Sequence, residues 1–407
     1  MKKTTVRILS LVLCAVMLCT VFAGCGSTKP AAQETSESQG SASQNTAAAD
    51  SADKTPIKIG VSTAITGPAP LDGERSVQGI NMAVEEINAA GGVNGRPLEV
   101  IIEDDQNTAN IAVNVVNKLV SDPDIVAILG PHRSTNAMAT EHIMASYEIP
   151  FLTGASSPNL TTQVDNPWFF RIRGSDSFVG QIIAKYALEE VKATKIGVIY
   201  NNDDYGTGGR DVVVEYLKAH GVEPVVVEGH NTDDKDMSGV ITKCKDAGVD
   251  CLIVYTHDPE AAILVRQKKE MGLDVPIVGP TTFTLPTFLS LVTAEETQNI
   301  YSVCDYVSTN PDPLASEFQK KFSEKYDTDP DLFAAAYYTG VYILADALER
   351  CGDDITRANL QQALLQTKDL PSVYGTLYSN EDGELVHAAV VAEIVDNQPV
   401  YNTVVYE

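Results

Sequence analysis

The chain has 407 residues, 44% of them hydrophobic and 21% charged, and its formal net charge is −26 at pH 7. This length exceeds the size at which a single hydrophobic core keeps growing, so we expect two lobes. The strongly negative charge repels phosphate backbones and anionic lipid head groups, which argues against a nucleic-acid-binding protein.

The first 25 residues have the order of an export signal. Three basic residues, at positions 2, 3 and 7, precede an apolar run from Ile8 to Phe22, and Ala23-Gly24 stands directly before Cys25. This order predicts a lipoprotein signal peptide over residues 1–24. Cys25 resembles the lipidated cysteine of a lipobox, although Phe22 stands where leucine is usual; plain secretion with an incidental cysteine is the alternative. We expect a lipid anchor at Cys25 that holds the protein at the outer face of the cell membrane.

The composition of residues 25–55 predicts a flexible tether. Beyond Cys25 the segment is rich in Ser, Ala, Thr, Gln and Gly and has no large apolar residue, so it cannot bury a core. No later apolar run reaches the roughly 20 residues that a membrane-spanning helix needs. The folded part is therefore expected to stand outside the cell on this tether.

The first half of the folded part alternates between short apolar strands and amphipathic helices. Apolar residues recur at steps of three and four between Glu74 and Ala90, the spacing of a helix with one buried face. The expected elements are strand Ile57–Val61, helix Glu74–Ala90, strand Leu98–Glu103, a helix after Thr108, strand Ile125–Leu129, helix Asn136–Tyr147, strand Ile149–Leu152 and strand Trp168–Arg173. This alternation predicts a parallel, doubly wound sheet.

The segment Ile125–Leu160 holds the strongest indication of a ligand site. Each of its two strands is followed by small and hydroxylated residues, Gly130–Thr135 after the first and Thr153–Pro158 after the second. Both loops are expected at the carboxyl ends of parallel strands, where ligands bind in open α/β sheets. The alternative is that these serines and threonines only cap helices.

The second half repeats the pattern, which indicates a second lobe of the same kind. The expected elements are helix Phe178–Val191, strand Lys195–Tyr200, helix Arg210–Ala219, strand Val225–Glu228, helix Met237–Ala247, strand Cys251–Tyr255, helix Ala261–Met271 and strands Ile277–Gly279 and Ile300–Val303. Three helices and three antiparallel or edge strands follow, at Pro313–Tyr326, Phe333–Cys351, Ile355–Thr367, Tyr374–Tyr378, Val386–Val395 and Val400–Val405. We expect an N-terminal lobe of residues 56–173 plus 308–372 and a C-terminal lobe of residues 174–307 plus 373–407.

The sequence lacks the patterns of known catalytic and metal sites. It has no G-x-S-x-G, H-E-x-x-H or G-x-x-x-x-G-K-[ST] pattern, and its six histidines form no ligand pair at helical spacing. We therefore expect no catalytic residue, no metal and no cofactor. Hydroxyl groups and helix N-terminal N–H groups on two facing rims suit a ligand carboxylate, so binding is favoured over turnover. A surface hydrolase is a rival hypothesis, which needs a nucleophile and a base converging on the cleft.

Several segments occur in an order that is known from one family. They are Thr66-Gly67-Pro68, Ala89–Arg96 (AAGGVNGR), Ile128–Pro131, Pro150 with Ala155–Pro158, Phe170-Arg171 and Asp204–Gly206. With them, the chain from Lys58 to about Asp382 resembles the type I periplasmic solute-binding proteins of ABC transporters, in the branch that binds leucine, isoleucine and valine. The resemblance implies two Rossmann-like lobes with a ligand cleft between them, joined by three hinge crossings near Arg173, Cys304–Ser308 and Pro371–Tyr374. It also implies delivery of the ligand to a membrane permease, and we expect a monomer; a ligand-sensing protein is the alternative.

The resemblance further implies which residues hold the ligand. In the first lobe it assigns the carboxylate and the neighbouring polar contacts to Ser134, Thr135, Gly154, Ala155 and Ser156. From the second lobe, Tyr205 is expected to close on the ligand. Each of these residues has a structural alternative as a helix cap or rim contact, and we expect His132 and Arg133 to face solvent.

One position departs from the family pattern. The acidic residue that normally follows a Gly-Pro pair and meets the ligand ammonium is Thr281 here. Another carboxylate then has to replace it, with Asp72, Asp258 and Asp305 as candidates, or the ligand lacks an α-ammonium. A buried ammonium without a counter-ion would cost several kcal/mol. Urea, short amides and aromatic carboxylates therefore remain open beside a branched-chain or other apolar amino acid.

Overall fold

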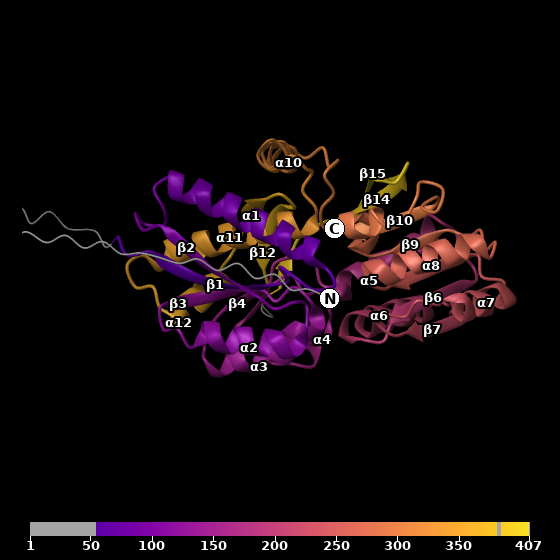
Figure 1. Ribbon diagram of the computed structural model, residues 1–407, viewed down its shortest axis with the longest axis horizontal. Coiled ribbons are helices and arrows are strands. Elements are labelled where there is room, and N and C mark those ends of the chain that lie inside the picture. The colour runs from indigo at the N-terminus through magenta and orange to yellow at the C-terminus, as the bar shows by residue number, and fades with distance from the viewer. Residues whose placement is uncertain (1–53, 381–383, 407) are drawn as a thin grey trace, which may run out of the picture. The chain divides into compact units, whose positions relative to one another are not determined.

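The computed structural model describes residues 54–380 and 384–406 (Figure 1). The predicted signal peptide, Cys25 as the predicted lipidation site and most of the predicted tether lie outside the described residues. Over the ranges that are described, no helix combines the length and the apolar character needed to cross a membrane.

The first lobe is built on a five-stranded parallel sheet in the order β2-β1-β3-β4-β5. Its strands and the helices between them are β1 (Ile57–Thr63), α1 (Pro70–Ala89), β2 (Leu98–Asp104), α2 (Ala109–Val120), β3 (Ile125–Leu129), α3 (Ser134–Ser146), β4 (Phe151–Thr153), α4 (Asn159–Thr162) and β5 (Phe169–Arg171). Neighbouring residues of β3 pack on opposite faces, Leu129 against α1 and Ile128 against α2 and α3. Because both faces are covered, the strand is continuously apolar.

Three later helices return to the first lobe. They are α10 (Pro313–Tyr326), α11 (Leu332–Cys351) and α12 (Arg357–Leu365), and their apolar residues belong to the same core as β1 and α1. Helix α11 lies beside α1 on one side of the sheet, with α2 and α3 on the other (Figure 1). A Cβ at Gly79 would stand 2.2 Å from the carbonyl oxygen of Ala334, so the glycine permits the close approach of α1 to α11.

The second lobe is built on a seven-stranded sheet in the order β15-β14-β10-β9-β8-β6-β7. Its elements are α5 (Asp176–Glu189), β6 (Ile196–Asn201), α6 (Asp204–Ala219), β7 (Val226–His230), α7 (Ser238–Ala247), β8 (Cys251–Tyr255), α8 (Asp258–Glu270), β9 (Ile277–Gly279), the 3-10 helix η1 (Thr281–Thr284), α9 (Pro286–Leu289), β10 (Ile300–Cys304), β14 (Ala389–Val395) and β15 (Gln398–Tyr406). Strands β6 to β10 are parallel, and β14 and β15 add antiparallel pairs at the β10 edge.

The chain passes between the two sheets three times. It does so after β5, after β10, and after a small antiparallel sheet of β11 (Leu370–Ser372), β12 (Gly375–Ser379) and β13 (Leu385–Val386). The small sheet contributes Val373, Tyr374 and Leu377 to the core of the first lobe. Because the chain leaves that core only after β13, the strand predicted over Val386–Val395 is interrupted at His387-Ala388, where the third passage lies.

Several helices begin earlier than the apolar spacing predicts. Helix α1 begins at Pro70 rather than Glu74, α3 at Ser134 rather than Asn136, and α6 at Asp204 rather than Arg210. The first turns of these helices are polar, so apolar periodicity does not reveal them. The carboxylate of Asp203 caps α6 by accepting a hydrogen bond from the Gly206 N–H at 2.9 Å. Polar residues predicted in loops therefore lie in first helical turns.

Candidate ligand-binding site

A cavity of about 60 Å³ lies where the two sheets face each other, enough for about four water molecules at roughly 15 Å³ each. Both lobes contribute to its lining: Asp72, His132, Arg133, Ser134, Gly154, Ser156 and Arg173 with Leu332 and Phe333 on one side, and Tyr205, His257, Asp258, Thr281, Thr282 and Leu285 on the other. Most of the residues predicted to hold ligand thus line one cavity.

The two lobes touch across this cavity. The hydroxyl of Ser157 donates to the carbonyl oxygen of Asp204 at 2.7 Å, and the hydroxyl of Thr287 donates to the Asp72 carboxylate at 3.2 Å. Each of these bonds joins a residue of the first lobe to a residue of the second. The structure therefore represents a closed cleft.

The first lobe presents hydrogen-bond donors to the cavity. Ser134 is the first residue of α3, so its side chain lies beside the free N–H groups of that helix, which attract anions. Its hydroxyl oxygen accepts from the Ser157 N–H at 3.2 Å, which fixes the neighbouring loop. Ser134 and Ser156 are both buried at 4% exposure and reach the cavity.

Two predicted contact residues do not line the cavity. Thr135 is half-buried at the side of α3, and Ala155 belongs to the core between β3, α2 and α3. The main chain of Ala155 is tied down behind the site, since its N–H donates to the Thr153 hydroxyl at 3.0 Å and its carbonyl accepts from Arg171. Ala155 therefore supports the loop that carries Gly154 and Ser156.

The expectation that His132 and Arg133 face solvent is wrong for His132, which is only 6% exposed and lines the cavity. Its ring packs edge-on against Phe333 at 5.0 Å between centroids, and neither ring nitrogen has a hydrogen-bond partner within the described chain. Burial and the nearby charge of Arg133 lower the pKa of His132 to about 3, so its ring is neutral. Arg133 is half-buried and also lines the cavity.

Two carboxylates from opposite lobes meet at the cavity. Asp72 lies in the first turn of α1 and Asp258 is the first residue of α8, and each is 4% exposed. Burial raises the pKa of Asp72 to about 6 against the opposing effect of Arg133. Burial, and then the charge of Asp72, raise the pKa of Asp258 well above its usual range. Within the described side chains, neither carboxylate has an ion-pair partner within 4 Å, whereas the buried Asp305 is paired with Arg173.

The second lobe presents Tyr205, the residue predicted to close on the ligand, in the first turn of α6, where it lines the cavity. Its ring stacks on His257 at 5.1 Å, and its hydroxyl lies 3.4 Å from that of Thr282. His257 is held in turn by Asp203, with Nε2 and Oδ2 2.6 Å apart. Burial raises the pKa of Tyr205 above its usual range, so the phenol stays protonated.

Asp305, the third candidate for the ammonium partner, does not line the cavity. It lies directly after β10, and its carboxylate is 3.0 Å from Nε of Arg173. Burial alone would raise the pKa of Asp305, but Arg173 and His387 lower it to about 2, so it is fully ionised. Asp305 is therefore the counter-ion of a protein arginine.

Arg173 reaches the cavity, although the sequence predicted it only as a hinge crossing. Its guanidinium donates to the Thr281 hydroxyl at 3.3 Å, so the position where the family resemblance predicted an acid holds an acceptor for arginine. The available signal was that Arg173 and Thr281 each follow the carboxyl end of a strand, β5 in the first sheet and β9 in the second, where ligand-binding residues lie in such sheets.

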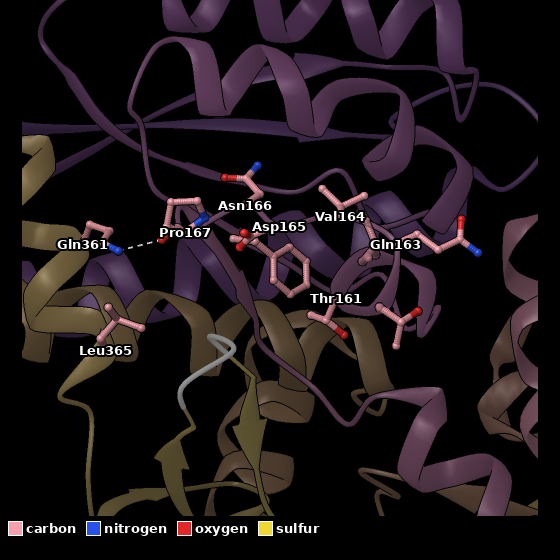
Figure 2. Close-up of a pocket in the computed structure, with 11 residues that line it drawn as sticks. Thr161, Gln163, Val164, Asp165, Asn166, Pro167, Gln361 and Leu365 are labelled. Atoms are coloured by element: carbon pink, nitrogen blue, oxygen red, sulfur yellow. Dashed lines mark hydrogen bonds between the residues drawn. The ribbon is translucent and has the colours of Figure 1, made fainter.

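A larger hollow of about 340 Å³ lies outside the cleft, between the α4–β5 connection and α12 (Figure 2). Gln361 donates a hydrogen bond to the Pro167 carbonyl at 2.7 Å across it. Among the described residues that line this hollow, Asp165 alone is charged. It brings together no pair of groups comparable with Asp72 and Asp258, so we take the smaller cavity as the site. In the described ranges, no group of three His, Cys, Asp or Glu side chains is arranged to hold a metal ion.

Comparison with known proteins gives one family over most of the chain. A model of the family described as periplasmic binding protein matches residues 56–399. The chain is 28% identical over 330 residues to the leucine-, isoleucine-, valine-, threonine-, and alanine-binding protein of Pseudomonas aeruginosa, a match that covers 81% of this chain and 87% of the relative.

Solved structures give the same result. The branched-chain amino acid transporter substrate binding protein LivJ from Streptococcus pneumoniae, in complex with isoleucine, is 29% identical with a TM-score of 0.77, over 85% of this chain and 100% of that one. A leucine binding protein, LivK, from Thermotoga maritima is 22% identical with a TM-score of 0.80, over 86% of this chain and 99% of that one. The predicted two-lobed α/β fold is therefore confirmed.

Proposed function

The chain belongs to the periplasmic binding protein family, and from this premise we propose that it is the solute receptor of an ABC importer for apolar amino acids. The similar proteins named above include branched-chain amino acid binders, and one was solved with isoleucine. The family is one of binding proteins rather than of enzymes, which supports a role in binding.

The charges of the cleft support a zwitterionic ligand. On our proposal the ligand carboxylate binds Ser134, Ser156 and the N-terminus of α3, where hydroxyls and a helix dipole favour an anion. The ligand ammonium binds between Asp72 and Asp258, which replace the acid that is missing at Thr281. The pairing of carboxyl groups from opposite lobes is the observation that carries the proposal. Burial raises both pKa values, the charge of Asp72 raises that of Asp258 further, and a cation bound between the two groups would stabilise their ionised forms.

The remaining wall of the cavity supports an apolar side chain. Leu285, Leu332 and Phe333 line it together. The space between them is small, so a short or branched aliphatic group agrees with it better than a ring system. Tyr205 covers the ligand from the second lobe, and closure by both lobes is the state that a permease would receive.

The attachment of the protein belongs to the same proposal. Family membership implies an extracytoplasmic location, and we propose that Cys25 carries the lipid that keeps the receptor beside its permease. We further propose that the protein is monomeric and has no catalytic activity.

Calorimetric titration tests the ligand assignment. The panel is alanine, valine, leucine and isoleucine against urea, acetamide and benzoate. We expect at least one apolar amino acid to bind in the micromolar range or tighter, and Ser156→Ala to weaken it by about tenfold through one lost charge-assisted hydrogen bond of roughly 1.5 kcal/mol. Ser146→Ala, at the far end of α3, is the control. Tighter binding of benzoate or urea than of every amino acid would overturn the proposal.

A further inference from the structure

Arg173 is placed between the ligand cavity and the three passages of the chain between the lobes. It follows β5 at the first passage and is only 7% exposed, and it lines the cavity together with Gly154, Ser156 and Thr281. A guanidinium carries five N–H donors in a fixed plane, so it can bond the protein on one side and a ligand on the other.

The protein side of Arg173 is held by residues of the other two passages. Asp305 comes directly after β10, and its carboxylate lies 3.0 Å from Arg173 Nε and accepts from the Gly174 N–H at 2.8 Å. His387 stands between β13 and β14, with Nε2 3.3 Å from the same carboxylate. The His387 ring stacks on Tyr374 at 4.9 Å. Arg173, Asp305 and His387 thus form one buried cluster with a member from each passage.

Arg173 stands apart from the two aspartates of the cavity, on which the charge of Arg133 acts instead. Arg173 is paired with Asp305 outside the cavity and donates to Thr281. The charges that act most strongly on Asp258 are those of Asp72 and Arg133, and Arg173 is not among them. A ligand with an anionic group toward Arg173 and a cationic group toward the two aspartates fits this separation.

We propose that Arg173 contacts the ligand carboxylate directly, and that Asp305 and His387 are positioning residues that couple this contact to the three interlobe passages. This inference rests on the proposed amino-acid ligand. The guanidinium completes the donor set of Ser134 and Ser156 from the side of the hinge. Occupancy of the cavity then fixes Arg173, and Arg173 fixes the relative orientation of the strands that enter both lobes.

The contact is tested by pairing a protein change with a ligand change. L-leucine and L-leucinamide, and L-alanine and L-alaninamide, are titrated into wild-type protein, Arg173→Gln and Arg173→Lys. We expect wild-type protein to prefer the acid over the amide by about 100-fold, and Arg173→Gln to reduce this ratio to about tenfold or less, because the amide lacks the charge that Arg173 recognises. Arg173→Lys keeps the charge without the planar donor set, and is expected to give an intermediate ratio.

A half-buried arginine elsewhere supplies the control. Arg357 donates to the carbonyl oxygens of Ile125, Asp122 and Tyr147 within the first lobe, and it lines no part of the cavity. Arg357→Gln is expected to lower stability while leaving the acid-to-amide ratio unchanged. An unchanged ratio in Arg173→Gln would overturn the contact and leave the proposed function standing. Failure of wild-type protein to bind either amino acid would overturn both. If Arg173→Gln does not fold, a wild-type ratio in Arg173→Lys overturns the contact in its place.

The coupling is tested by Asp305→Asn and His387→Gln. At saturating L-leucine, wild-type protein is expected to decrease in radius of gyration in small-angle scattering. Asp305→Asn is expected to lose most of this decrease and part of the acid-to-amide discrimination, because Arg173 is no longer held. Full closure with wild-type discrimination in both variants would overturn the positioning role.

Discussion

Replacement of Asp258 by asparagine distinguishes an amino acid from every ligand that lacks a cation. Asp258 is almost fully buried in the closed cleft, and its Oδ1 atom has no hydrogen-bond partner within the described chain. Asparagine has nearly the same shape, so the substitution changes the charge and little else. It leaves Asp72 as the single carboxylate that faces the ligand ammonium.

The magnitude follows from the cost of removing one partner of a buried charge pair. Such truncations cost about 2 to 5 kcal/mol, and relief of the repulsion from Asp72 places Asp258→Asn toward the lower part of this range, at about 3 kcal/mol. At 1.4 kcal/mol per factor of ten, the dissociation constant of the amino acid rises about 150-fold. For a ligand that is only an anion, the sign reverses, because the substitution removes a repelling charge.

Isothermal titration calorimetry at pH 7 measures both effects, the expected loss of affinity for the best amino acid and the expected gain of affinity for benzoate. Glu260→Gln is the matched control, since Glu260 lies in the same first turn of α8 and loses the same charge, but it accepts from the Asp233 N–H at 2.7 Å and does not line the cavity. A change below about threefold for Asp258→Asn, or tighter amino-acid binding, would refute the assignment of the ammonium to this pair.

Three further predictions concern closure, packing and the second lobe. The pKa of Asp72 is about 6 in the closed cleft against ~4 when the group is exposed, so protonation of Asp72 favours the closed state. As pH rises from 4 through 6, the unliganded closed state should lose roughly 2 to 3 kcal/mol of stability relative to the open state, and small-angle scattering should show opening. Gly73→Ala places a Cβ 1.7 Å from the Ala64 carbonyl oxygen and should displace the start of α1. The midpoint of urea unfolding should then fall, and binding should weaken by tenfold or more. Gly239→Ala, where the added Cβ meets open space, should leave the urea midpoint and the affinity within error of wild type. Tyr205→Phe should change affinity by less than about threefold, because within the described part of the chain the hydroxyl bonds only Thr282, at 3.4 Å. Tyr205→Ala should weaken binding by tenfold or more, and equal losses in the two variants would contradict a covering role for the ring.

Elements with apolar interiors could be predicted from the sequence almost to the residue. Strand β3 has the predicted bounds Ile125–Leu129, because a strand buried on both faces is apolar along its whole length. The first turns of α1, α3 and α6 could not be predicted, because their polar residues look the same in a loop and in a helical turn. These turns carry Asp72, Ser134 and Tyr205. Three residues that line the cavity therefore lie in helical turns that apolar spacing could not predict.

The direction of side chains was the second feature that could not be predicted from the sequence. His132 and Arg133 are adjacent polar residues, and only the packing of α11 against the first lobe decides that the histidine is buried against Phe333. Asp305 and Asp258 both follow strands of the second sheet, so the sequence offered them as equal candidates. The chain continues from Asp258 into α8, but from Asp305 it leaves for the first lobe, and that difference places one carboxylate at the cavity and the other beside Arg173.

The contacts that close the cleft have a kinetic consequence. A space of about 60 Å³ between lobes that are bonded to each other holds a bound amino acid from both sides, so the lobes must separate before the ligand can leave. The dissociation rate is then limited by the rate of opening, and residence time depends on contacts such as the Ser157–Asp204 hydrogen bond that never touch the ligand. A transporter that receives the closed receptor must therefore supply the work of separating two surfaces, and rim substitutions would set how fast cargo is handed over.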